Sequence, residues 1–313
     1  MKSTSRALLG VFVLAALAAC GESPDPGYLL TRQRVVGAIR TVVGEPERTT
    51  PRPGETVRVQ WQTIAPGVVE PHTWLILACA PSDQAFGVPV CGEAPFEIFS
   101  QTTPVDGPPD LEIEVPADYE ADQLVLLGSI CMGGIVETNL DPTSTIEDLR
   151  PCRGDEGTGE IVSGTVTVEQ RPELRNLRPR FMSLSLRGEE MTETVDEARQ
   201  PCVGGTLPVV SLDEEAEITI TPVPDQRETY IDPVLEEETV EELQNSLFVT
   251  EGTLNRRFTF IDEGTPEPTV EFLAEADDDD PLPDEGRSVK LVVVMRDRRG
   301  GEDIISRAFC LVP

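Results

Sequence analysis

The stretch SVKLVVVMR, from Ser288 to Arg296, decides the fold, because it is an apolar, β-branched run that leads into a turn. The turn residues DRRGGE occupy 297–302, and a second apolar run extends from Asp303 to Val312. Strand, Gly-Gly turn and strand predict a β-hairpin, because glycine supplies the positive φ that a tight turn needs. Side chains alternate along a strand, which places four residues of the returning strand on one face: Ile304, Ala308, Cys310 and Val312.

The rest of the chain repeats this pattern of short strands separated by clusters of Pro, Gly and Asp. In the first half we expect strands at 34–43, 55–64, 73–79, 95–100, 111–115, 123–131 and 160–169. In the second half we expect them at 180–186, 216–221, 245–250, 256–261 and 269–273, ahead of the hairpin. The acidic run 236–242 fits either a short helix or an extended loop. Few helices and many antiparallel strands predict a mainly β protein with two antiparallel β-sandwiches.

The N-terminal residues have the composition of an export signal. Lys2 and Arg6 precede the apolar residues 7–16, a run too short to cross a bilayer as a helix. The following LAAC, Leu17 to Cys20, resembles the lipobox of bacterial lipoproteins. The resemblance implies cleavage before Cys20, acylation of that cysteine and a lipid anchor in the bilayer. Gly21 in place of Asp favours the outer over the inner membrane, and the alternative is an ordinary signal peptide with a chance cysteine.

The expected domain organisation follows from these two observations. It comprises a signal peptide (1–19), a lipidated cysteine and flexible tether (20–33), a first sandwich (34–171), a linker, PELRNLRP (172–179), and a second sandwich (180–313). Residues 34–313 resemble in their architecture the tandem immunoglobulin-like modules of bacterial cell-envelope lipoproteins, and VVVMRDRRGG is the stretch that best carries the likeness. The Cys…Trp…Cys spacing of antibody domains is absent, which argues against a true immunoglobulin domain.

The charge balance restricts the partners. With 57 acidic and 25 basic residues the net charge is −32, and loss of residues 1–19, which carry +2, leaves about −34. Such a surface repels the phosphates of nucleic acids and anionic headgroups. We therefore expect no nucleic acid partner, and instead an envelope or extracellular protein whose identity the composition does not give.

The six cysteines other than Cys20 predict disulfides, because their number is even and the chain carries an export signal. We expect neighbours in sequence to pair, as Cys79–Cys91, Cys131–Cys152 and Cys202–Cys310. A rival pair, Cys79–Cys131, is possible if those residues end adjacent strands. No two cysteines form a CxxC pair, so neither a zinc site nor a thioredoxin-type site is predicted, and no metal or cofactor is expected.

Few residues are candidates for chemistry. His72 is the only histidine, lies at an expected strand start without a GxSxG motif, and is interpreted as a surface or rim residue. Carboxylate pairs are abundant, but Trp61 and Trp74, both on expected strands, offer little for a sugar-binding platform. Asp277–Asp280 is rich in oxygen ligands for Ca²⁺ but lacks EF-hand spacing.

Together these features predict a membrane-anchored cell-envelope lipoprotein that acts as a non-enzymatic binding or structural module. Two alternatives stay open: a surface-tethered hydrolase that uses carboxylates, and a Ca²⁺-dependent adhesion module at Asp277–Asp280. A deep pocket with converging carboxylates near Trp61 or Trp74 would distinguish the hydrolase from the other two.

Overall fold

The computed structural model describes residues 26–82, 89–137, 152–153, 157–202, 205–212, 214–232, 237–275 and 281–313. Within these ranges the regular elements are β-strands, apart from one 3₁₀ turn at Pro172–Leu174. No helix in them has the length and apolar content to cross a membrane.

The first sandwich packs a three-stranded sheet on a four-stranded sheet. The first sheet has the order β1-β2-β5, with β1 Arg34–Val42, β2 Thr56–Ile64 and β5 Asp110–Glu114. The second has the order β4-β3-β6-β7, with β4 Glu97–Val105, β3 His72–Cys79, β6 Gln123–Met132 and β7 Thr158–Thr167. The core between them contains Val57, Val59 and Trp61 of β2, which alternate as the sequence predicted.

The second sandwich is larger but has the same strand order at its centre. One sheet runs β15-β17-β11-β8-β9, with β15 Thr253–Leu254, β17 Thr269–Leu273, β11 Glu215–Pro222, β8 Phe181–Leu186 and β9 Glu189–Glu190. The other runs β10-β19-β18-β14-β16, with β10 Val209–Ser211, β19 Glu302–Val312, β18 Arg287–Arg296, β14 Leu243–Val249 and β16 Phe258–Ile261. A separate ribbon joins β12 Thr229–Ile231 to β13 Glu238–Val240.

The two sandwiches therefore share one topology. β8, β11 and β17 correspond to β1, β2 and β5, while β16, β14, β18 and β19 correspond to β4, β3, β6 and β7. Sheets of three and four antiparallel strands with crossings between them form the immunoglobulin-like sandwich. The expected fold class, two antiparallel immunoglobulin-like β-sandwiches, is thus confirmed.

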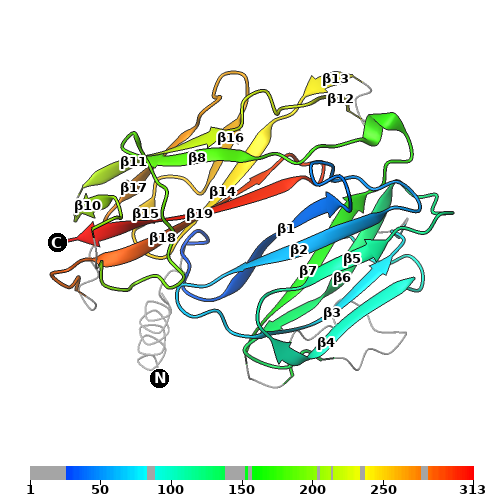
Figure 1. Ribbon diagram of the computed structural model, residues 1–313, viewed down its shortest axis with the longest axis horizontal. Helices are drawn as coiled ribbons and strands as arrows, with labels where there is room; N and C mark the ends of the chain where they lie inside the picture. The colour runs from blue at the N-terminus through cyan, green and yellow to red at the C-terminus, as the bar shows by residue number, and fades with distance from the viewer. Residues whose placement is uncertain are drawn as a thin grey trace, which may run out of the picture.

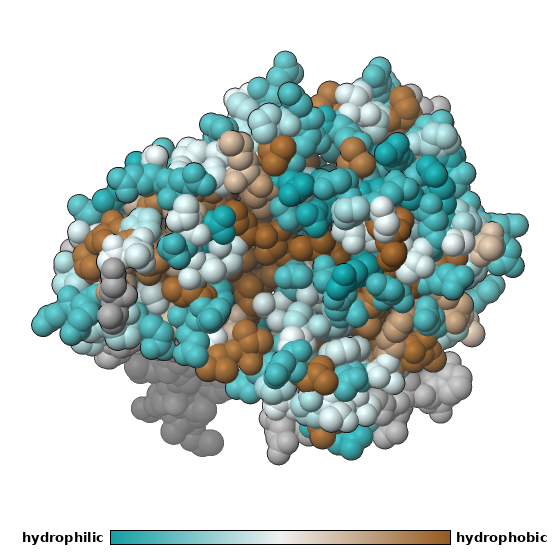
Figure 2. All heavy atoms as spheres, viewed as in Figure 1, coloured by the Kyte–Doolittle hydropathy of each residue, from teal (hydrophilic) through white to brown (hydrophobic). Residues whose placement is uncertain are grey.

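The β18–β19 hairpin lies at the centre of the molecule. Ten residue pairs join its strands, from Arg287↔Leu311 to Arg296↔Glu302. In Figure 1 the hairpin, coloured orange to red, lies beside the blue β1 of the first sandwich. Figure 2, in the same view, shows apolar side chains recessed in the middle of this face, where the two sandwiches meet.

One expectation about the connecting segments is wrong. Residues 26–33 of the expected flexible tether are packed, since Leu29 pairs with Val249 and Leu30 is fully buried. The expected linker 172–179 lies between β7 and β8, and its Asn176 is fully buried. Both segments meet partners from the other sandwich, which their own composition does not reveal. The acidic run 236–242 is extended where it is described and forms β13.

Candidate functional site at the joint between the sandwiches

The six cysteines outside the N-terminal segment form the three expected disulfides. Cys79 bonds Cys91, Cys131 bonds Cys152, and Cys202 bonds Cys310, with Cα–Cα distances of 5.5, 5.2 and 6.0 Å. The rival pair Cys79–Cys131 is wrong. Strands β3 and β6 are antiparallel, so Cys79 lies opposite Val125 while Cys131 lies opposite Thr73, at the other end of the pair.

Two predicted sites lie outside the described residues. Cys20, the expected lipid attachment site, precedes residue 26, and Asp277–Asp280 falls in the gap 276–280. The lipid anchor and the Ca²⁺ alternative therefore stay predictions.

An apolar strip forms the base of the joint between the sandwiches. Val292 and Val294 of β18 pack with Val36 of β1 and Ile64 of β2, and Leu30 of the N-terminal segment completes the cluster. The neighbours of the two valines in β18, Val289, Leu291 and Val293, point the other way into the core of the second sandwich. β18 is thus buried on both faces, which explains why its sequence is continuously apolar rather than alternating.

The hairpin turn of the second sandwich is bonded to the linker and to the first sandwich. Oδ1 of Asp297 accepts hydrogen bonds from the backbone N–H groups of Arg299 and Gly301, at 2.7 and 2.8 Å. Its Oδ2 accepts one from Nδ2 of the buried Asn176 at 2.8 Å, and the same amide donates to Thr49 Oγ1 at 2.9 Å. Only glycine fits at position 301, because a Cβ there would lie 2.0 Å from the Asp297 carboxylate.

In a second contact between the sandwiches, the carboxylate of Glu302 on β19 bonds to the backbone of β1. Its Oε2 accepts a hydrogen bond from the backbone N–H of Ala38 at 2.9 Å, and its Oε1 accepts one from Arg296 Nε at 3.2 Å. Gly37 permits this approach, since a Cβ there would lie 2.3 Å from the carboxylate. Arg296 also donates to the backbone carbonyl of Val36 at 2.5 Å, so that it ties the hairpin to β1.

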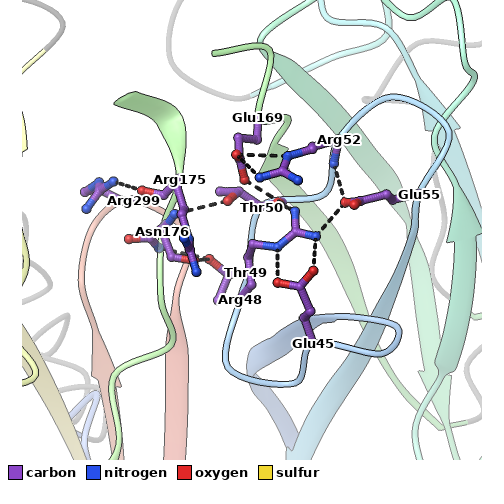
Figure 3. A network of polar contacts seen from close by, with 10 residues as sticks. All are labelled: Glu45, Arg48, Thr49, Thr50, Arg52, Glu55, Glu169, Arg175, Asn176 and Arg299. Carbon is purple, nitrogen blue, oxygen red and sulfur yellow. Dashed lines mark hydrogen bonds and ion pairs between the residues drawn. The ribbon is translucent and has the colours of Figure 1, made fainter. Parts of the chain in front are cut away.

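Behind the linker lies a buried ion network around Arg48, drawn in Figure 3. The Arg48 side chain is 2 % exposed and reaches Glu45 at 3.0 Å, Glu55 at 2.7 Å and Glu169 at 3.3 Å. Its Nη1 also donates to the carbonyl of Thr50 at 2.7 Å. The Arg48 guanidinium lowers the pKa of Glu45 by hydrogen bonding and by charge. The network fixes the 45–55 loop to the strand end at Glu169, next to the linker.

The sequence analysis missed this network, because residues 45–54 have the composition of a charged, solvent-exposed loop. A buried guanidinium needs carboxylate partners, and one of those around Arg48 comes from a distant segment. Glu169 lies 121 residues from Arg48 in the chain. A signal was present only in the clustering of Arg with Glu over 45–55.

Arg299 closes the outer side of the joint. Its Nη1 contacts Glu241 at 2.7 Å and Glu228 at 3.4 Å, and the guanidinium lies 4.4 Å from the ring centre of Tyr230. Burial, together with the nearby Asp297, raises the pKa of Glu241 to about 7, against the opposing effect of Arg299. The outer contact therefore contains a carboxyl group that titrates near neutrality.

The tryptophans do not form a sugar platform. Trp61 is 5 % exposed in the core of the first sandwich, and Trp74 of β3 packs partly buried against the same core. A cavity does adjoin Trp61, with Glu160 and Glu302 in its wall. One oxygen of Glu160 accepts the Val35 backbone N–H, and both oxygens of Glu302 are hydrogen-bonded. These carboxylates hold β1 in place.

His72 is not the surface or rim residue that the sequence suggested. It is fully buried at the start of β3, and its Nε2 lies 3.0 Å from Nε2 of Gln33. Since the Gln33 amide donates this bond, the ring accepts it and is neutral. Gln33 also pairs with the backbone of Glu70, which ties the N-terminal segment to β3. Burial lowers the pKa of His72.

We expect His72 to make the fold sensitive to acid. The unfolded chain binds a proton at His72 near pH 6.5, whereas the folded ring does so only at lower pH. Stability is therefore complete above pH 6.5 and is lost as the pH falls toward the folded pKa, by up to about 1.4 kcal/mol per pH unit. The variant His72→Gln keeps an acceptor for Gln33 and removes this loss.

The measurement is the free energy of unfolding in urea between pH 7.5 and 5.5, for wild type and His72→Gln side by side. Glu160 and Glu241 have raised pKa values and therefore change stability in the opposite direction, but they do so in both proteins. The difference between the two pH profiles therefore reports on His72 alone. Parallel pH profiles of the two proteins would contradict the expectation.

Comparison with known proteins gives only distant likeness. The chain matches no protein family model and no curated protein. Among solved structures it is similar to native Escherichia coli alpha-2-macroglobulin, with 10% identity, a TM-score of 0.22 and coverage of 89% of this chain. A mutant of Salmonella alpha-2-macroglobulin gives 14% identity, a TM-score of 0.21 and 88% coverage. In each case the match spans 16% of the larger chain, about a sixth of its length.

Proposed function

We propose that the chain is an exported lipoprotein of the cell envelope, anchored by acylated Cys20, whose two sandwiches act together as a rigid, non-enzymatic binding or structural module. The outer membrane is the proposed location. The joint is the observation that carries this proposal. Its apolar strip, its Asn176–Asp297 contact and its Arg48 network leave no free linker among the described residues between the sandwiches.

A fixed joint suits a spacer or platform. Two sandwiches on a flexible linker would reorient freely, whereas packed ones present their loops in one geometry. Ordering the loops in advance lowers the entropy cost of binding a partner. The disulfides support an exported location, because such bonds persist in oxidising compartments. The partner proposed is a protein of the envelope or of the cell exterior, not nucleic acid.

The substitution Cys20→Ser tests the anchor. We expect the variant to remain an unprocessed precursor and to incorporate no labelled palmitate in a bacterial host, because serine offers no thiol for the lipid. Two or three acyl chains hold a protein at a membrane almost permanently, so the wild type should sediment with membranes and resist a salt wash.

The matched control is Ser23→Ala, three residues further on, which should be processed and lipidated like the wild type. A Cys20→Ser protein that is cleaved and released would support the ordinary signal peptide instead. Lipidation of Cys20→Ser would overturn the proposed anchor altogether.

The partner is sought by cross-linking in intact cells followed by purification of the adducts. We expect discrete adducts with wild type and their loss in a variant with a weakened joint, Gly37→Val, whose Cβ would displace the Glu302 carboxylate. Wild type and Gly37→Val both keep Cys20 and therefore the same expected anchor. Equal yields of adducts from the two proteins would argue against a role for the fixed geometry.

A further inference from the structure

A cavity of about 280 Å³ opens at one side of the first sandwich, between β1 of one sheet and β7 of the other. The β18–β19 hairpin of the second sandwich forms part of its wall through Arg296 and Glu302. Its size is just below the range for small-molecule sites, about 300–1,000 Å³, and so suits a small ligand. The cavity therefore lies mainly in the first sandwich, and the second sandwich closes part of it.

Two features of the strands create this space. Arg40 lies on the same face of β1 as Ala38. The neighbours of Ala38 in the sheet are core residues, so this is the inner face of the strand. Gly164 of β7 faces Arg40 from the opposite sheet, and a Cβ at Gly164 would lie 3.3 Å from Arg40 Nη2. A larger residue at 164 would occupy the cavity, whereas glycine leaves it open beside the guanidinium.

Arg40 retains hydrogen-bonding capacity on the cavity side. Its side chain is 11% exposed, and Nη1 donates to the carbonyl of Gly300 at 3.0 Å and lies 3.7 Å from Glu302. Nη2 makes no hydrogen bond to any residue in the described part of the chain. By contrast, the three nitrogens of Arg296 bond to Glu302, Ser246 and Val36. Arg40 is thus the cationic group with a donor to spare.

The charged residues of the cavity wall are balanced, whereas the protein as a whole has a net charge of −32. The residues that line the cavity include two arginines, Arg40 and Arg296, and two glutamates, Glu160 and Glu302. Burial raises the pKa of Glu160, while Arg34 and Arg32 oppose that shift. Both Glu302 oxygens are already hydrogen-bonded, and burial disfavours the charged form of Glu160, so the spare Nη2 donor of Arg40 favours an anionic ligand at this place.

The remaining wall is apolar. Ala38, Trp61, Leu126 and Val162 belong to the core between the two sheets or pack against it, and they also line the cavity. Trp61 is 5 % exposed, lines the cavity and makes no side-chain hydrogen bond to a described residue, so it adds apolar surface to the wall. A ligand bound here would place an apolar body on this surface.

We propose that this cavity binds a small organic carboxylate with an aromatic or branched apolar body. The carboxylate accepts hydrogen bonds from Arg40 Nη2, and the body packs against Trp61, Leu126 and Val162. A charge-assisted bond from a largely buried arginine supplies the affinity for the anion, and the apolar wall selects for the body.

The test uses benzoate and isovalerate as probes, with the full chain, by ligand-observed NMR and by quenching of tryptophan fluorescence. We expect saturable binding of both in the millimolar range, about −4 kcal/mol. Benzamide, which has the same shape without charge, and acetate, which has the charge without the body, should each bind at least about tenfold more weakly. This comparison uses wild type alone.

Two variants locate the binding. Arg40→Gln removes the charge and should weaken benzoate at least about tenfold, and Gly164→Val fills the space and should abolish binding. The matched control is Arg58→Gln, an exposed arginine on β2 that pairs with Asp110 and should bind benzoate like wild type. Circular dichroism and cooperative melting confirm that each variant is folded.

The proposal is overturned if neither carboxylate saturates, if benzamide binds as well as benzoate, or if folded Arg40→Gln and Gly164→Val retain wild-type affinity. Equal weakening in Arg58→Gln would also overturn it, because it would indicate general screening of charge rather than a site at Arg40.

Discussion

Replacing Cys202 and Cys310 together by alanine is expected to lower the free energy of unfolding by about 4–5 kcal/mol, the largest effect of any disulfide in the chain. The bond joins residues 108 apart and thereby encloses most of the second sandwich, apart from β8 and β9. A crosslink stabilises mainly by restricting the unfolded chain, and the restriction grows with the length of the loop. Urea denaturation followed by fluorescence and circular dichroism measures the loss.

The matched control is the double variant Cys79→Ala/Cys91→Ala. This bond joins residues only 12 apart and lies in the first sandwich, so its removal should cost less, about 3 kcal/mol. Paired substitutions leave no free thiol in either protein. If the two double variants lose equal stability, loop length is not the source of the stabilisation.

Replacing Arg48 by methionine is expected to lower the free energy of unfolding by about 3–5 kcal/mol. Methionine fills a similar volume but leaves Glu169, whose side chain is 5 % exposed, without one of its two arginine partners. A buried carboxylate that loses its partner costs far more than the ion pair contributed, because its desolvation is no longer offset. Thr50 also loses the donor to its carbonyl.

Arg58→Met is the control for Arg48. Arg58 pairs with Asp110 at 2.5 Å, but the two side chains are 46 % and 39 % exposed. Exposed pairs contribute about 0–1 kcal/mol, so that this variant should be nearly neutral. Adding Glu169→Gln to Arg48→Met should recover part of the loss, since an uncharged amide needs no cation. Equal losses for Arg48→Met and Arg58→Met would contradict the buried role of the network.

Much of the fold could be predicted from the sequence. The hairpin bounds 288–296 and 303–312 differ from β18 and β19 by a single residue at one end of each strand. Gly300, with a φ of 107°, supplies the positive φ expected of the turn. Pairing of cysteines in sequence order was also correct. These features are local, because strand alternation and turn chemistry depend on residues close together in the chain.

The short strands escaped prediction. β9, β10, β12, β13 and β15 have two or three residues each and no alternating pattern. β10 is a strand only because it runs parallel to β19, from Val209↔Cys310 to Ser211↔Val312. Such elements owe their conformation to a partner strand that is distant in sequence.

By itself, the sequence determined the β class, the positions of the long strands, the hairpin and the cysteine pairs. Alternation, turn residues and cysteine order can all be recognised without knowledge of the tertiary contacts. Only the tertiary structure decided what covers each face. Ile304 of the hairpin faces the joint while Ile305 faces the core, although the alternation treats both faces alike. Likewise Arg48 and His72 are buried because Glu169 and Gln33, 121 and 39 residues away, supply their partners. The pattern of a strand defines two faces, but the neighbours that bury them come from contacts that no local pattern encodes.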